Sequence, residues 1–240
     1  MPVLLSTAYF PPVSYFASMA SGMEGLHRKG GDRNSILPSP LIPSTVYIEA
    51  CENFQKQSYR TRCRIYAADG VQDLSVPVVH DKSGRGVPIM DVKVDYSKPW
   101  LLQHKRAIVS AYRTSAYFEY YQDELFSILD TRPETLMELN TSILNFFIRK
   151  TGLAVDLRMT GEFSLDGRLS SPDGTIIECS DLRNTIHPKR PDTVLAAVGL
   201  EKPYFQVFSP KYGFKSNLSI MDLLFNEGPD SILYLYPALA

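Results

Sequence analysis

The chain has 240 residues, of which 44% are hydrophobic and 21% charged, so it can bury a sizeable core as a globular protein. Its 25 basic and 26 acidic side chains give a formal net charge of −1, which argues against a nucleic acid or an anionic membrane as the main partner. Three scattered cysteines, Cys51, Cys63 and Cys179, fit neither a disulfide framework nor a zinc ribbon. A reducing compartment, the cytoplasm, is the expected location. No uninterrupted apolar run is long enough to predict a membrane span.

The first half of the chain predicts a strand, a turn and a helix, followed by more strands. Residues 3–8 form a short apolar run, and residues 13–20 have helical spacing after a Pro-Pro turn. The Gly- and Pro-rich stretch 22–43 predicts a surface loop. Further strands are predicted by runs of strand-forming residues at 45–50, 59–67, 71–79 and 89–94. Asp69-Gly70 predicts a hairpin between the second and third of these.

Three consecutive helices are predicted over residues 98–150. Ser97 and Ser115 are expected to cap the first two, and Thr131 with Glu134 gives a capping-box pattern for the third. Later strands are expected at 175–179, 204–208 and 232–236, and a final helix at 217–226. The prediction is one α/β domain, residues 1–240, with a mixed sheet that contains the antiparallel hairpin and has the three helices packed on it.

His104 stands out in the first of these helices. On a helical projection it falls near the centre of the apolar face, beside Trp100 and Ile108. A titratable ring in that position is either a core histidine with its hydrogen bonds satisfied or the lining of a pocket. Both interpretations stay open from the sequence alone.

Alternate arginines mark the predicted strand 59–67. Arg60, Arg62 and Arg64 are expected on one face, about 7 Å apart, where their guanidinium groups could bind phosphates or carboxylates. Gln55 and Lys56 would extend this polar surface. The alternative is a charged edge strand that resists aggregation.

Standard nucleotide, metal and hydrolase signatures do not occur in the sequence, so no cofactor and no metal site are predicted. The polar run SDLRNTIHPKRPDT contains His187, which marks a loop, although the adjoining Arg183, Lys189 and Arg190 would allow a second contact with an anion.

Several segments, taken together and in order, resemble the WbqC-like family. They are AYFPPVSYF, ENFQKQSYRTRCRI, LSVPV, a W-x-x-x-H pattern, AYFEYY, YFQVF and GFKSNLSIMDLLFNEGP. The resemblance implies a soluble bacterial protein that is linked with O-antigen or other surface-polysaccharide gene clusters and is suspected of modifying sugars.

The family's motifs fall on particular residues of this chain. Thr61 and Cys63 replace two asparagines of the family's N-R-N-x-I pattern, and Ser14 stands where a glycine is usual, so the ligand of this member could differ. The matching positions are Tyr9, Phe10, Pro11, Phe54, Gln55, Lys56, Trp100, His104, Asn217, Leu218, Ser219 and Asp222. The opening strand, turn and helix are also similar to nucleotidyltransferase-like sheets, in which phosphates meet a helix N-terminus.

The resemblance and the residues together suggest a transferase that acts on a sugar or sugar nucleotide in surface-polysaccharide biosynthesis. His104 would be the general base and Asp222 would orient or balance a charge. The expected partners are an anionic sugar derivative and other enzymes of the pathway. The residues expected to bind it are Tyr9, Gln55, Lys56, Arg60, Arg62, Arg64, Trp100, Tyr117, Asn217 and Ser219. The alternative is a non-catalytic module that binds a glycan precursor or a partner enzyme.

Overall fold

A computed structural model describes residues 1–21, 43–79, 86–171, 173–197 and 202–236. The predicted loop at 22–43 therefore lies almost entirely outside the described residues.

A four-stranded parallel sheet is the centre of the α/β fold. Its spatial order is β5-β2-β1-β8, with β1 (Val3–Ser6) and β2 (Ser44–Glu49) inside and β5 (Val155–Met159) and β8 (Ser180–Asp181) at the edges. Helix α1 (Val13–Ser21) follows β1. The residues of β1 are all buried, which explains why this strand is a continuous apolar run and not an alternating one.

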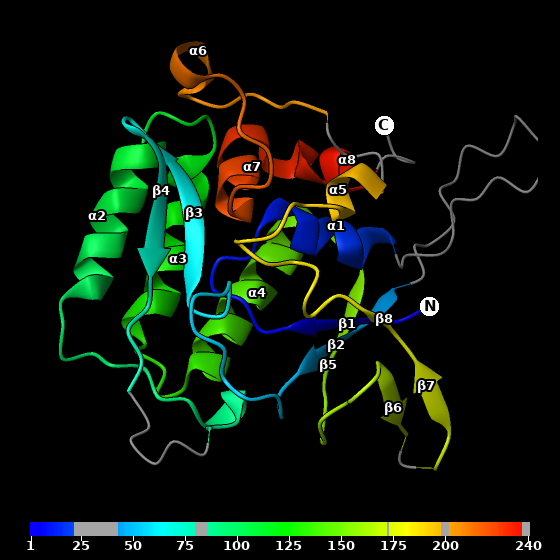
Figure 1. Ribbon diagram of the computed structural model, residues 1–240. Coiled ribbons are helices and arrows are strands. Elements are labelled where there is room, and N and C mark those ends of the chain that lie inside the picture. The colour runs from blue at the N-terminus through cyan, green and yellow to red at the C-terminus, as the bar shows by residue number, and fades with distance from the viewer. Residues whose placement is uncertain (22–42, 80–85, 172, 198–201, 237–240) are drawn as a thin grey trace, which may run out of the picture.

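The predicted hairpin is confirmed, but it forms a sheet of its own. Strands β3 (Arg62–Ala67) and β4 (Gly70–Ser75) pair antiparallel, and Gly70 takes the turn with a φ of 108°. In Figure 1 this hairpin stands beside helix α2 (Trp100–Tyr112), away from the parallel sheet. The α/β class is therefore right, whereas the hairpin is not part of a mixed sheet.

The three predicted helices are present as α2, α3 (Phe118–Asp130) and α4 (Leu136–Thr151), but their predicted caps are wrong. The capping box of α4 is formed by Thr135 and Glu138, one turn later than Thr131 and Glu134. Thr131 instead ends α3 and donates its hydroxyl to the Ile128 carbonyl.

Ser97 and Ser115 do not cap the first two helices either. Pro99 and Tyr117 stand at the two N-cap positions, and neither position has a side-chain cap. Ser115 is buried, and its hydroxyl has no hydrogen-bond partner among the described residues.

Short elements complete the described chain. In chain order these elements are η1 (Ile89–Asp91), β6 (Arg168–Ser170), β7 (Ile176–Glu178), α5 (Val194–Ala197), α6 (Ser209–Tyr212), α7 (Ile220–Glu227), η2 (Gly228–Asp230) and α8 (Ser231–Leu235). Strands β6 and β7 form a separate antiparallel ribbon that lies beyond the parallel sheet in Figure 1.

Three of the predicted strands are wrong. Residues 89–91 form a 3₁₀ turn, residues 232–235 belong to a helix, and residues 204–206 have no regular structure. In the last case the side-chain amide of Gln206 bonds both backbone groups of Lys215, which takes the place of a strand partner. Short apolar runs of this kind do not distinguish strands from other buried segments.

One large core joins the parallel sheet to the helices. It is rich in aromatic rings, among them Phe10, Phe16, Phe147 and Phe225, which are fully buried. No helix within the described parts of the chain is apolar over a length that could cross a membrane.

Candidate anion-binding site

The topology of the parallel sheet indicates where a ligand would bind. From β1 the chain continues to β2 and then β5 on one side, and β8 pairs with β1 on the other side. In open parallel sheets, ligands bind outside the carboxyl ends of the strands at the point where the strand order reverses. That point lies between β1 and β8.

A small pocket lies at this edge, and a larger one adjoins it. The small pocket has a volume of about 10 Å³, room for roughly one water molecule, and is lined by residues at the ends of β1 and β8. The larger pocket has a volume of about 200 Å³. Tyr59 and Ile186 belong to both walls.

We call the larger pocket the arginine pocket. Its lining combines basic, acidic and neutral polar side chains from segments far apart in sequence. They are Ser14, Tyr59, Arg64, Thr185, Ile186, His187, Arg190, Asp192, Ser216 and Asn217. A pocket with two guanidinium groups and several polar groups suits an anionic ligand.

The start of α1 forms one wall of the arginine pocket. Asn217 accepts a hydrogen bond from the Ser14 backbone N–H at 2.9 Å through its side-chain oxygen, so it caps α1 from a distant segment. Asn217 has a φ of 53°, in the left-handed region that asparagine tolerates better than most residues. Backbone bonds from Val13 to Leu218 and from Ile220 to Pro11 fix the two segments together.

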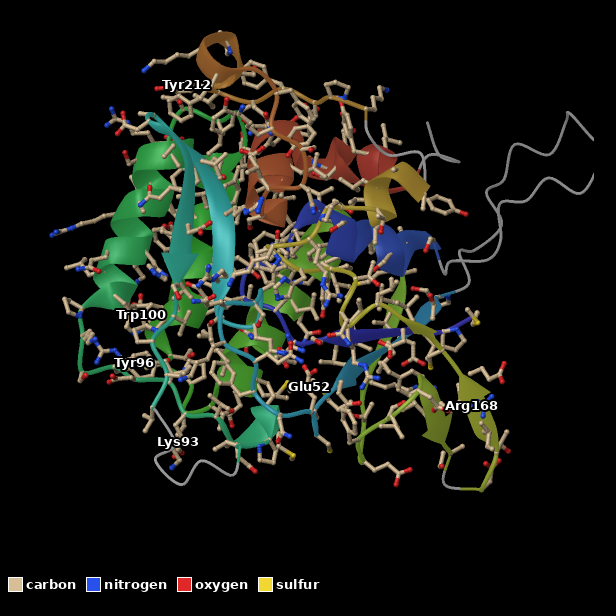
Figure 2. The ribbon with its side chains drawn as sticks, in the orientation of Figure 1. Glu52, Lys93, Tyr96, Trp100, Arg168 and Tyr212 are labelled. Atoms are coloured by element: carbon tan, nitrogen blue, oxygen red, sulfur yellow. The ribbon has the colours of Figure 1, made fainter. Side chains whose placement is uncertain are left out.

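The prediction that Arg60 shares one face of a strand with Arg62 and Arg64 is wrong. This residue precedes β3, is only 2% exposed, and forms an ion pair with Glu52, with a second hydrogen bond to the same carboxylate at 2.8 Å. Its guanidinium group also donates to the Ser6 hydroxyl at 2.7 Å. Figure 2 shows Glu52 between the hairpin and the parallel sheet. Arg60 therefore ties the end of β1 to the loop before β3.

A second buried ion pair lies at the same sheet edge. Arg183 bonds Glu49, at the end of β2, at 2.9 Å and Asp181, at the end of β8, at 2.6 Å. Glu49 also accepts the hydroxyl of Thr160 at 2.7 Å. These contacts hold the ends of β2 and β8 in place below the pockets.

Arg62 and Arg64 lie on β3 as predicted. Arg62 approaches Asp73 on β4 at 3.9 Å. Arg64 lines the arginine pocket and donates to the Pro188 carbonyl at 2.8 Å. The loop that carries His187 is thus fastened onto the hairpin.

His187 stands in the arginine pocket among positive charges. Desolvation lowers the pKa of its imidazole, and Arg190, Arg60 and Lys189 lower it further. The Lys189 backbone N–H donates to Nδ1 at 3.2 Å, so the neutral ring is assigned its proton on Nε2. His187 can therefore donate a hydrogen bond from Nε2 to an anion.

Two polar atoms of the pocket lining have no hydrogen-bond partner among the described residues. One is the hydroxyl of Ser14, a residue with no exposed surface, and the other is Oδ2 of Asp192. Asp192 uses its Oδ1 to accept the backbone N–H groups of Val194 and Leu195 at the start of α5. Buried polar atoms are usually paired, so these two need an explanation.

His104 lies in the core and does not line the arginine pocket. Its Nδ1 shares a hydrogen bond of 2.9 Å with the Tyr9 hydroxyl, and the Trp100 ring packs on it with 5.0 Å between centroids. Burial lowers the pKa of His104 to about 4. Trp100 stacks on Tyr96, and the two are neighbours in Figure 2.

Asp222 is also buried, in α7. It accepts hydrogen bonds from the Tyr204 hydroxyl at 2.8 Å and the Gln206 amide at 2.7 Å. Burial raises its pKa to about 6.

The other predicted binding residues are scattered. Ser219 is the N-cap of α7, and the Tyr117 ring packs against Gly228. Gln55 and Lys56 are exposed on the loop before Arg60, where Gln55 accepts a bond from Arg60 at 3.4 Å. Of the ten predicted binding residues, the structure places Arg64 and Asn217 in the arginine pocket.

Arg190, which the sequence suggested as part of a second anion contact beside His187, lines the arginine pocket. Ser14 and Asp192 were not predicted as site residues. The signal for Asp192 was the polar run around His187, which has no periodicity and could not be placed in space. No cluster of three or more potential metal ligands occurs within the ranges that the structure describes.

Comparisons with known proteins place the chain in a family. The model of the WbqC-like protein family matches residues 44–234. The chain therefore belongs to the WbqC-like family, as the sequence segments indicated. The match begins after AYFPPVSYF, the first of those segments.

A relative in Mycobacterium tuberculosis is similar to this chain. It is the uncharacterized protein Rv1507c, which is 26% identical over 197 residues, covering 76% of this chain and 83% of the relative. No solved structure matches the chain.

Proposed function

We propose that the arginine pocket binds an anionic donor and that the protein is a transferase acting on a sugar or sugar nucleotide in bacterial surface-polysaccharide biosynthesis. The observation that carries the proposal is the arginine pocket, which adjoins the pocket at the carboxyl edge of the parallel sheet and has Arg64, Arg190 and His187 in its lining. The sugar and the pathway come from the family resemblance.

Each group of the pocket has a distinct task in this proposal. Arg64 and Arg190 neutralise the anion, and each is held in place by a backbone carbonyl, that of Pro188 and that of Asn184. His187 adds a neutral donor. The proposal gives no task to His104 and Asp222, which are buried with side-chain partners of their own.

The proposal is tested first by binding. Isothermal titration with sulfate or UDP-glucose is expected to give at least tenfold weaker affinity for Arg64→Ala and Arg190→Ala, because each loses charge-assisted hydrogen bonds worth about 1.5–3 kcal/mol. Arg168→Ala is the control, since Arg168 lies on the β6–β7 ribbon (Figure 2). Equal affinities in all three variants would count against the pocket.

Transfer is tested separately. The wild-type chain is incubated with nucleotide sugars and candidate acceptors, and products are followed by mass spectrometry. Transfer that is lost in Arg64→Ala supports the transferase. Binding without any product would favour the non-catalytic binding module.

A further inference from the structure

Asp192 is the acidic residue in a pocket otherwise suited to anions. A carboxylate beside Arg64 and Arg190 weakens the binding of a simple anion, because like charges repel. Its presence therefore needs a reason beyond anion binding.

Capping accounts for only one of its two oxygens. Oδ1 accepts the backbone N–H of Val194 at 2.9 Å and that of Leu195 at 3.3 Å. Oδ2 has no hydrogen-bond partner among the described residues and is shielded from solvent. An asparagine or serine would cap α5 equally well, so the cap does not require the second oxygen.

Oδ2 can only accept hydrogen bonds when the carboxylate is ionised. The partner that completes it must be a donor, such as a hydroxyl or an amine. The Ser14 hydroxyl, which is also unpaired in this pocket lining, can act as donor or acceptor. The lining thus contains two cationic donors for an anion and, on Asp192, a buried acceptor that lacks a donor among the described residues.

We propose that the arginine pocket takes a ligand in which an anionic group and a hydroxyl or amine lie close together, with Arg64 and Arg190 on the anion and Asp192 accepting the hydroxyl or amine. A sugar phosphate has this chemistry, and a simple phosphate ester does not. The inference rests on the proposed function, because it assumes that an anion occupies the pocket, and it adds how the ligand is selected.

The test compares probes that share the anion and differ in the donor. Affinities for methyl phosphate, which has no hydroxyl or amine outside its phosphate group, and for glucose 1-phosphate and phosphoethanolamine, which carry a hydroxyl or an amine, are measured by calorimetry. The wild-type chain is expected to bind at least one of the latter two about tenfold tighter than methyl phosphate, through a hydrogen bond to a charged group.

Asp192→Asn is the decisive variant. It retains the Oδ1 cap and replaces Oδ2 by a donor, so the preference over methyl phosphate is expected to fall to about twofold or less. Methyl phosphate itself is expected to bind at least as tightly as before, because a like charge is gone. Asp166→Asn is the matched control, since it neutralises an exposed carboxylate in the turn before β6 and should keep the wild-type preference.

The outcomes separate the two proposals. The role of Asp192 is overturned if the wild-type chain binds glucose 1-phosphate and phosphoethanolamine no tighter than methyl phosphate. It is also overturned if Asp192→Asn keeps the same ratio of affinities as the wild type. Anion binding stands in both cases. If methyl phosphate does not bind, or if Arg64→Ala binds it as tightly as the wild type does, the proposed anion site is wrong, and the role of Asp192 is then wrong as well. If Asp192→Asn does not fold, Asp192→Ser keeps a capping oxygen and carries the same expectation.

Discussion

The core around His104 and the arginine pocket around His187 hold the same residue type in opposite settings. Burial lowers the pKa of His104, which shares its hydrogen bond with Tyr9. The pKa of His187 is lowered by desolvation and by cations, and its side chain lines the arginine pocket. The comparison teaches that a lowered pKa by itself does not distinguish a core histidine from one that lines a pocket, so the position of the ring has to be considered with it.

The arginines show the same contrast between a residue in the core and a residue in the pocket. Arg60 has its charge neutralised by Glu52 inside the protein, whereas Arg64 lies against the open pocket and meets Asp73 only at 4.0 Å. Substitutions in the core should therefore change stability, and substitutions in the pocket should change binding. The predictions below test this division.

The largest effect is expected for Arg60→Ala. It leaves the Glu52 carboxylate, 4% exposed, without its partner, which should lower the free energy of unfolding by about 3–5 kcal/mol in urea titrations. Arg158→Ala is the control, because Arg158 is paired with Asp156 at the surface and should cost at most about 1 kcal/mol. Similar losses in both variants would remove the distinction between the two kinds of arginine.

His104→Gln should change how stability depends on pH. The folded pKa of about 4 is below the ordinary 6.5, so the contribution of His104 is present above pH 6.5 and lost as the pH falls towards 4. The loss corresponds to about 3 kcal/mol. The difference in unfolding free energy between wild type and His104→Gln should therefore shrink as the pH falls. A constant difference would mean that His104 is not buried as a neutral ring.

Asp222→Asn should show the opposite sign. The folded pKa of about 6 is above the ordinary 3.8, so the contribution of Asp222 is present below pH 3.8 and lost as the pH rises through 6. The difference between wild type and Asp222→Asn should shrink by up to about 3 kcal/mol over that range in the same urea titrations. In the wild type the two titrations oppose each other, which is why the variants are needed.

The smallest effect is expected at His187. Sulfate should bind up to about fivefold tighter as the pH falls through the lowered pKa of His187, because the protonated ring adds a charge to a partly exposed site. Calorimetry from pH 7.5 to 5.5 should show this rise in the wild type and not in His187→Gln, whereas His104→Gln should keep it. A rise that persists without His187 would assign the titration to another group.

The sequence was informative where local chemistry decides the structure. The Asp69-Gly70 turn, the three helices and the Ser219 cap follow from patterns within a few residues. Thr131 and Thr135 both begin a T-x-x-E pattern, and only the actual structure shows which one forms the capping box. Apolar run length could not separate the helix at 231–235 from a strand.

The candidate site was less accessible because it is assembled across the chain. Helical periodicity drew attention to His104, and that periodicity is the property of a core residue. His187 and Asp192 lie in a stretch without periodicity, so nothing local indicated that they would meet Arg64 and Ser14. Strand alternation placed Arg60 with Arg64, but the strand begins only at Arg62.

The bond between Asn217 and the start of α1 has a consequence for synthesis on the ribosome. The arginine pocket needs Ser14 from the beginning of the chain and Asn217 from near its end. A nascent chain that has emerged only to residue 200 contains both buried ion pairs, yet it lacks the cap of α1 and one wall of the pocket. The arginine pocket is thus completed only in the last steps of synthesis, after most of the core has had the chance to fold.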